Sequence, residues 1–140
     1  MQDLNFRRDA TQQTIDRFKP KPYALGKGDC ARMIATHIRN MGRPIIALSK
    51  VKNYTTLVGA VRALKDATGH DNLLDAMSEH FPEQAPAACL IGDIVAVNSE
   101  LPIGALSVYV GNGAVFAYEA ENDFPIFGRL VEPIKAWRII

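Results

Sequence analysis

The feature that most constrains the fold of this chain is a change of hydrophobic periodicity near Pro86. Before this residue, apolar side chains recur every three or four positions, which is typical of amphipathic helices. After it they form short runs bounded by glycines, which is typical of strands. No linker separates the two halves, and 140 residues match the size of one ordinary domain. We therefore expect a single α+β domain over residues 1–140, in which N-terminal helices pack on a C-terminal antiparallel sheet.

The expected parts are an N-terminal helix with an approach segment (1–22), a helical half (23–85) and a sheet (86–140). The first helix is predicted over Asp9–Phe18, because the prolines that follow it lack amide donors. The clearest helical pattern runs over Cys30–Met41, where Gly42 suits a left-handed terminator. Two more helices are predicted before Gly69 and Pro82 from these apolar residues: Leu57, Val61 and Leu64, then Leu73, Leu74, Met77 and Phe81.

The second half predicts a β-meander. Strands are expected over residues 94–97, 106–110 and 114–118, and the last two are joined by Gly111-Asn112-Gly113, which tolerates the positive φ of a tight hairpin. Short strands near 126–131 and 136–140 complete the sheet. Trp137 and the two isoleucines near it indicate a last strand packed within the sheet or against a neighbouring protein.

Composition excludes several classes of function. With 48% hydrophobic and 22% charged residues the chain is a folded, soluble domain, and a net charge of +1 provides no long-range field for nucleic acid or anionic lipid. The first residues lack the apolar core of a secretory signal, and no segment is apolar for long enough to span a membrane. We expect the chain to be made in the cytoplasm and to remain there unless an assembly carries it elsewhere.

Cys30 is the first candidate for chemistry. It follows Gly26-x-Gly28-Asp29, so its thiol stands at the first turn of a helix after flexible residues. A helix amino terminus favours a thiolate, and its free amides can stabilise an oxyanion beside the sulfur. The alternative is a small buried hydrophobe, which most free cysteines are. Asp29 can likewise serve only as the cap of the helix.

No cofactor or metal site is predicted. Cys30 and Cys89 are expected to be free thiols, since they and the three histidines show no metal-ligand spacing. The basic stretch from Lys19 to Pro22 can dock an acidic partner or can be a solvated loop.

Three segments occur in an order typical of one superfamily: Tyr23 to Cys30 before an apolar helix, Gly92-Asp93-Ile94-Val95, and Tyr109 to Gly113. They resemble the nucleophile segment, the Gly-Asp strand, and the strand and turn after the catalytic histidine of the NlpC-type cysteine peptidases. These papain-like enzymes cleave cell-wall peptides. With its final Ala136-Trp137-Arg138, the chain is also similar to a branch of small phage proteins of uncharacterised function, found among tail genes.

The resemblance implies a papain-like fold with Cys30 in the position of the nucleophile. It also implies a missing partner: the peptidases have a histidine four residues before the tyrosine matched at Tyr109, and this chain has Ala105 there. Without that general base, a peptidase of the usual mechanism is not expected. Tyr23 and Asp29, both in the matched nucleophile segment, are candidate supporting residues.

None of the three histidines stands where the chemistry needs one. His37 is on the same predicted helix as Cys30 but about 10 Å along its axis, beyond hydrogen-bond reach. His70 and His80 flank the predicted fourth helix and can act only if folding brings one of them to Cys30. We retain His80 as a candidate supporting residue, against the alternative of a solvated or capping histidine.

Two functions follow from the resemblance. The first is a structural component of a phage or prophage tail tip or baseplate, made in the host cytoplasm and carried in the virion, which binds neighbouring tail proteins. The second is an active cysteine peptidase or amidase that cleaves peptidoglycan peptides during genome delivery, with Cys30 as nucleophile. Ala105 favours the first, and the near-neutral charge fits a subunit held by protein contacts.

Overall fold

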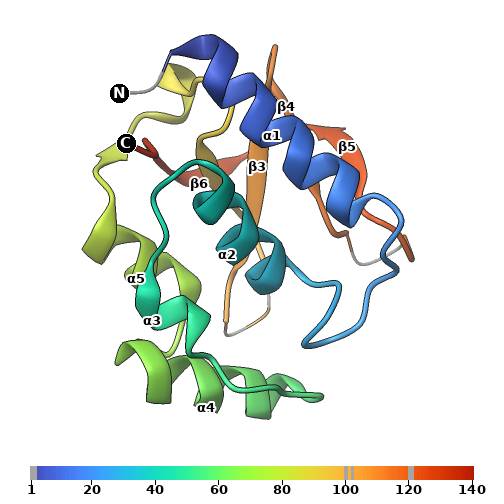
Figure 1. Ribbon diagram of the computed structural model, residues 1–140, viewed down its shortest axis with the longest axis vertical. Helices are drawn as coiled ribbons and strands as arrows, with labels where there is room; N and C mark the ends of the chain where they lie inside the picture. The colour runs from blue at the N-terminus through green and yellow to red at the C-terminus, as the bar shows by residue number, and fades with distance from the viewer. Residues whose placement is uncertain (1–2, 100, 102, 120–121) are drawn as a thin grey trace.

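The computed structural model describes residues 3–99, 101, 103–119 and 122–140, and Figure 1 shows its first two helices lying over a C-terminal antiparallel sheet. The expected α+β class, with N-terminal helices and a C-terminal sheet, is confirmed. Among the described residues, no helix combines the length and the apolar character needed to cross a membrane. The elements, in chain order, are α1 (Leu4–Phe18), α2 (Cys30–Asn40), α3 (Ile46–Ser49), α4 (Leu57–Thr68), α5 (Leu73–His80), β1 (Glu83–Gln84), the 3₁₀ helix η1 (Pro86–Ala88), β2 (Ile94–Val97), β3 (Ala105–Gly111), β4 (Ala114–Ala117), β5 (Ile126–Arg129) and β6 (Pro133–Trp137).

The six strands form one sheet in the order β1-β6-β2-β3-β4-β5, and the paired strands are antiparallel. The predicted meander is present as β2 to β5. Its hairpin at Gly111-Asn112-Gly113 takes φ values of 101°, 54° and 74°, which two glycines and an asparagine tolerate. The last strand does not extend the meander but returns to lie between β1 and β2.

The core lies between the helices and one face of the sheet. Helix α2 carries most of the contact, because Met33, Ile34 and Ile38 on its inner face are fully buried. Each such side chain stabilises the fold by about 1.5–3 kcal/mol relative to an exposed position. On the sheet they meet a row that crosses four paired strands through Trp137, Ile94, Val108 and Phe116, also fully buried. This packing fixes the start of α2 against the sheet.

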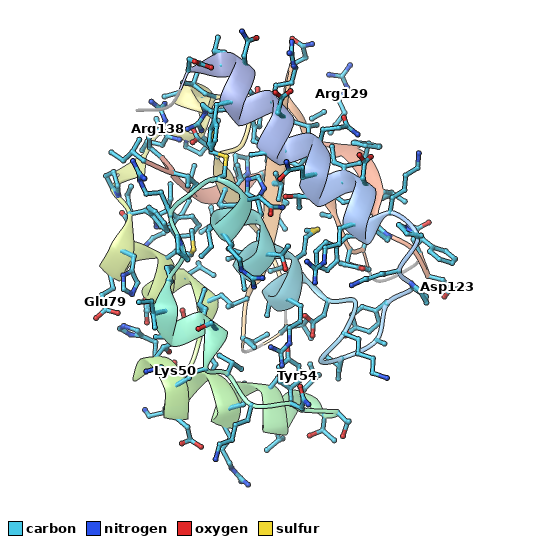
Figure 2. All side chains as sticks on the ribbon, viewed as in Figure 1. Lys50, Tyr54, Glu79, Asp123, Arg129 and Arg138 are labelled. Carbon is cyan, nitrogen blue, oxygen red and sulfur yellow. The ribbon has the colours of Figure 1, made fainter. Side chains whose placement is uncertain are left out.

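A buried ion pair ties α1 to the sheet. Arg7 and Asp93 are both 0% exposed; the Arg7 Nη2 donates to Asp93 Oδ1. Arg7 also donates to the carbonyls of Ile91 and Ile139, each at 2.8 Å. Asp93 Oδ2 accepts from Arg138 Nε at 2.8 Å, and Figure 2 shows Arg138 near the amino-terminal end of α1. The Gly-Asp and Ala-Trp-Arg motifs therefore meet at one carboxylate.

Three details differ from the expectations drawn from the sequence. Helix α1 begins at Leu4 rather than Asp9, because the Asp3 side chain caps it by accepting from the Phe6 amide at 2.8 Å. Three short elements, α3, β1 and η1, carry too few residues to show a periodic pattern. The last strand spans Pro133–Trp137 instead of residues 136–140.

Candidate functional site

The candidate site lies where the first turn of α2 meets the start of β3. Cys30 is the first residue of α2, and Asp29 is its N-cap: Asp29 Oδ1 accepts from the Arg32 amide at 2.8 Å. The other carboxylate oxygen accepts from the Gly26 amide at 2.8 Å and from the Tyr54 hydroxyl at 2.6 Å. Both oxygens of Asp29 are therefore occupied by structural hydrogen bonds, as the capping alternative predicted.

The Gly-x-Gly pattern before Cys30 is required by close packing of the loop. A Cβ at Gly26, where φ is +85°, would approach the Tyr54 carbonyl oxygen to 2.3 Å, and a Cβ at Gly28 would approach the Pro22 carbonyl oxygen to the same distance. Backbone atoms cannot move aside as a flexible side chain can. These glycines let the loop fold tightly and present Asp29 and Cys30 at the helix start.

The Cys30 thiol faces the backbone on both sides of residue 105. Its Sγ lies 3.9 Å from the carbonyl oxygen of Gly104, and the amide of Leu106 is close enough to lower its pKa. Burial nevertheless raises the pKa of Cys30 to about 11, and the neighbouring Asp29 carboxylate raises it further. The helix-start amides therefore act in the expected direction, but burial outweighs them, and the thiol is protonated near neutral pH.

Three tyrosines surround the site. Tyr54, labelled in Figure 2 near the amino-terminal end of α2, is bonded to Asp29, and its pKa is raised by burial and by that hydrogen bond. The rings of Tyr23 and Tyr118 meet edge to face with centroids 6.1 Å apart. Burial, then Asp29 and Cys30, raises the pKa of Tyr23, so the structure does bring this candidate to the site. All three phenols stay neutral near pH 7 and provide no base for the thiol.

The histidines lie elsewhere. His80, the third supporting candidate, is placed 3.3 Å from Glu79 Oε2, which also accepts from His70 at 3.1 Å. Figure 2 shows Glu79 at the left margin of the view and Tyr54 near its lower centre. His37 is fully buried: its Nε2 lies 2.8 Å from the carbonyl oxygen of Gly92, and its pKa is lowered to about 4, mainly by burial. None of the chain's three histidines, all within the described residues, hydrogen-bonds to Cys30.

A cavity of about 20 Å³ lies beside the first turn of α2, lined mainly by apolar residues that include Ala31, Tyr54 and Ile103. This holds roughly one water molecule and excludes a peptide side chain. In the described part of the chain, no three His, Cys, Asp or Glu side chains are arranged to bind a metal ion, and both cysteines are free thiols.

Two features of the structure were not predicted from the sequence: two of the tyrosines near Cys30 and the buried Arg7 of α1. Tyr54 and Tyr118 reach the site from loops that no motif marks. Arg7 did carry a signal, because it stands at helical spacing in the buried face of α1, which consists of Arg7, Ala10, Thr11, Thr14, Ile15 and Phe18. An arginine within such a repeat indicates a buried partner of opposite charge.

The comparisons with known proteins add one finding. The sequence profile of a family described as a domain of unknown function (DUF6950) matches residues 4–139. None of the curated proteins compared with the chain matches it.

Proposed function

The chain belongs to the DUF6950 family, described only as a domain of unknown function, and from this premise we propose that it is a non-catalytic binding protein. In this proposal it is a component of a phage or prophage tail tip or baseplate, made in the host cytoplasm and carried in the virion. It keeps a papain-like NlpC-type fold, without peptidase chemistry, and binds neighbouring tail proteins.

The observation that carries the proposal is the identity of residue 105. In the NlpC-type peptidases that the sequence resembles, the general base stands at the matching position. Here the Cys30 sulfur lies 3.9 Å from the Gly104 carbonyl oxygen and close to the Leu106 amide, so the backbone at residue 105 is next to the thiol. The residue there is Ala105, which cannot accept a proton. The residue next to the thiol therefore cannot act as a general base, which supports a non-catalytic role.

The arrangement of elements supports the papain-like part of the proposal. A helix that begins with the matched cysteine packs against the strand that begins at the matched base position, and the Gly-Asp strand, β2, lies next to that strand. The turn after Tyr109 closes the hairpin between β3 and β4. The three motifs therefore lie on adjoining elements, as a shared site requires.

The second candidate is an active cysteine peptidase or amidase. It is favoured by the survival of the Asp-Cys helix start and of the amides that face the sulfur. It is disfavoured by a thiol pKa of about 11 and by histidines that bond to other groups. A nucleophile also needs its thiolate and a proton donor for the leaving amine.

Thiol labelling separates the two candidates. At pH 7 a thiol with a pKa of about 11 is ionised to about 10⁻⁴, against about 3% for an ordinary cysteine, so we expect Cys30 in the folded chain to react about 300-fold more slowly than in urea. Cys89, whose pKa is also raised to about 11 by burial, is the internal reference. Mass spectrometry of Cys30→Ser and Cys89→Ser chains with an electrophilic probe gives each rate separately. Rapid labelling of Cys30 beside a slow Cys89 would support the peptidase instead.

The tail role has its own test. In the phage or prophage that encodes the chain, deletion of the gene is expected to block particle assembly, whereas Cys30→Ala is expected to leave both assembly and infectivity intact. Particles that assemble normally with Cys30→Ala but cannot infect would contradict the proposal.

A further inference from the structure

Strand β5 forms one of the two edges of the sheet. This strand pairs with β4 through four residue pairs, from Ala114 with Arg129 to Ala117 with Ile126. On its other side, β5 has no partner strand among the described residues. Figure 1 shows β5 at the margin of the sheet, on the opposite side from β6. The outward main-chain donors and acceptors of this strand are therefore open to another extended segment.

The opposite edge is protected in ways that β5 is not. Strand β1 has only two residues, and its Glu83 is paired with Lys135 at 3.1 Å. Short length and charge are two devices by which natural sheets prevent edge-to-edge pairing. Strand β5 is twice as long, contains neither lysine nor proline, and carries its one charge at Arg129, its last residue.

Two phenylalanines, Phe116 and Phe127, form an aromatic row that runs from the core to the β5 edge, where the second ring is exposed to solvent. Phe116 of β4 is fully buried, and its ring lies 5.1 Å from that of Phe127 in β5. The two residues are directly opposite in the strand register, so both side chains lie on the face of the sheet that bears the helices. Phe127 remains 52% exposed. A partner strand at this edge would cover that ring.

We propose that β5 pairs with β5 of a second copy of this chain, antiparallel and about a two-fold axis at Phe127. This axis is perpendicular to the sheet, so the helix-bearing faces of both copies lie on the same side of the joined sheet. Phe127 of one copy must therefore lie opposite a residue of the other copy whose side chain is also on the helix-bearing face. Pairing Phe127 with its own counterpart satisfies this condition, and the aromatic row then continues from one Phe116 to the other.

A second copy fits this edge for two reasons. Only an extended main chain matches the alternating donors and acceptors of a strand edge, and β5 supplies that pattern to its own copy. A two-fold contact also closes on itself. It leaves outside only the opposite edges, where β1 is short and the part of β6 beyond it carries Pro133 and Lys135, which gives a dimer and not a fibre. The inference is independent of Cys30 and holds whether or not the thiol is catalytic.

Sedimentation equilibrium of the wild-type chain tests the proposal. With the axis at Phe127, residues 126–128 of the two β5 strands lie opposite one another, and Arg129 falls opposite Pro125 just before the strand. This interface is small, so we expect a weak dimer with a dissociation constant on the order of 100 µM. The average mass is expected to rise from 15.4 kDa toward twice that value between about 5 µM and 1 mM. A monomer mass over the whole range would overturn the proposal.

A matched pair of variants locates the contact. Phe127→Lys places like charges opposite each other and is expected to leave a monomer. Phe124→Lys makes the same chemical change at a phenylalanine 49% exposed but outside the strand, and is expected to dimerise like the wild type. A dimer that survives Phe127→Lys, or that both variants abolish, would contradict pairing through β5.

Hydrogen exchange on the wild-type chain decides the question even if Phe127→Lys fails to fold. Amide exchange within Ile126–Arg129 is expected to slow as concentration rises through the dissociation constant, while exchange at Glu83 and Gln84 stays constant. Slowing at the β1 amides, or no change at β5 where the mass shows a dimer, would overturn the proposal.

Discussion

Replacement of Asp93 by asparagine is expected to remove a large share of the stability of this fold. The change keeps the size and shape of the side chain but removes its charge. In the native structure the Asp93 carboxylate is 0% exposed. Its two oxygens accept from five donors, namely Arg7 Nη2, the Ile139 amide, Gln84 Nε2, the Leu90 amide and Arg138 Nε.

The expected loss in the free energy of unfolding follows from the buried Arg7 guanidinium, which loses its counter-charge. Without the carboxylate, the Arg7 guanidinium stays fully buried with two carbonyl oxygens and no counter-charge. Removing one partner of a buried pair typically costs about 3–5 kcal/mol. A domain of this size is stable by about 5–15 kcal/mol, so the loss amounts to roughly a fifth of the total or more. No cavity contributes, since asparagine and aspartate have nearly the same volume.

The assay is urea unfolding followed by fluorescence. The chain has a single tryptophan, Trp137, which is fully buried in β6 one residue before Arg138 and so reports on this region. The control is Lys135→Met, which breaks the ion pair with Glu83 at side chains that are 41% and 49% exposed. An exposed pair contributes less than about 1 kcal/mol.

We expect Asp93→Asn to lower the unfolding midpoint with little change in the dependence on urea, and Lys135→Met to be nearly neutral. A double-mutant cycle with Arg7→Met should show that the two buried residues are coupled by more than about 1 kcal/mol. A loss below about 1 kcal/mol for Asp93→Asn, equal to that of the control, would refute the reasoning from burial.

Two further predictions concern single side chains. His37 has a folded pKa of about 4 against an unfolded value of about 6.5, so its contribution to the free energy of unfolding is present above pH 6.5. About 3 kcal/mol should be lost as the pH falls toward 4, and His37→Gln should remove this dependence in urea unfolding; an unchanged slope would contradict it. Ala105→His, placed beside the thiol, is expected to speed alkylation of Cys30 near pH 7 by at least about tenfold, without affecting the other cysteine. An unaltered rate would mean that position 105 is not where a base acts.

The helices were predictable because their signals are local. Apolar spacing identified α2, α4 and α5, and Gly42 and Gly69 take the positive φ of 76° and 81° expected after helix ends. The place of β6 was not predictable, because insertion between β1 and β2 depends on pairing partners 36 to 54 residues earlier in the chain. A short strand carries no mark of which neighbour it will choose.

In the candidate site too, features set by adjacent residues were predictable and features set by distant residues were not. Cys30 at a helix start and the Asp29 cap follow from adjacent residues, and both were predicted correctly. The raised pKa of Cys30 was not, because the groups that enclose its sulfur include the backbone near Gly104, 74 residues away. Burial is a property of the whole fold, so a motif alone fixes the position of a thiol and not its reactivity.

The hydrogen bonds of Arg7 also affect how the chain can fold during its synthesis. This residue leaves the ribosome before its partners Asp93 and Ile139, which follow 86 and 132 residues later. Until they emerge, docking α1 on the nascent core would bury an unpaired guanidinium. Docking of α1 with its arginine paired therefore needs the segment after β6, and we expect such long sequence separations to slow folding.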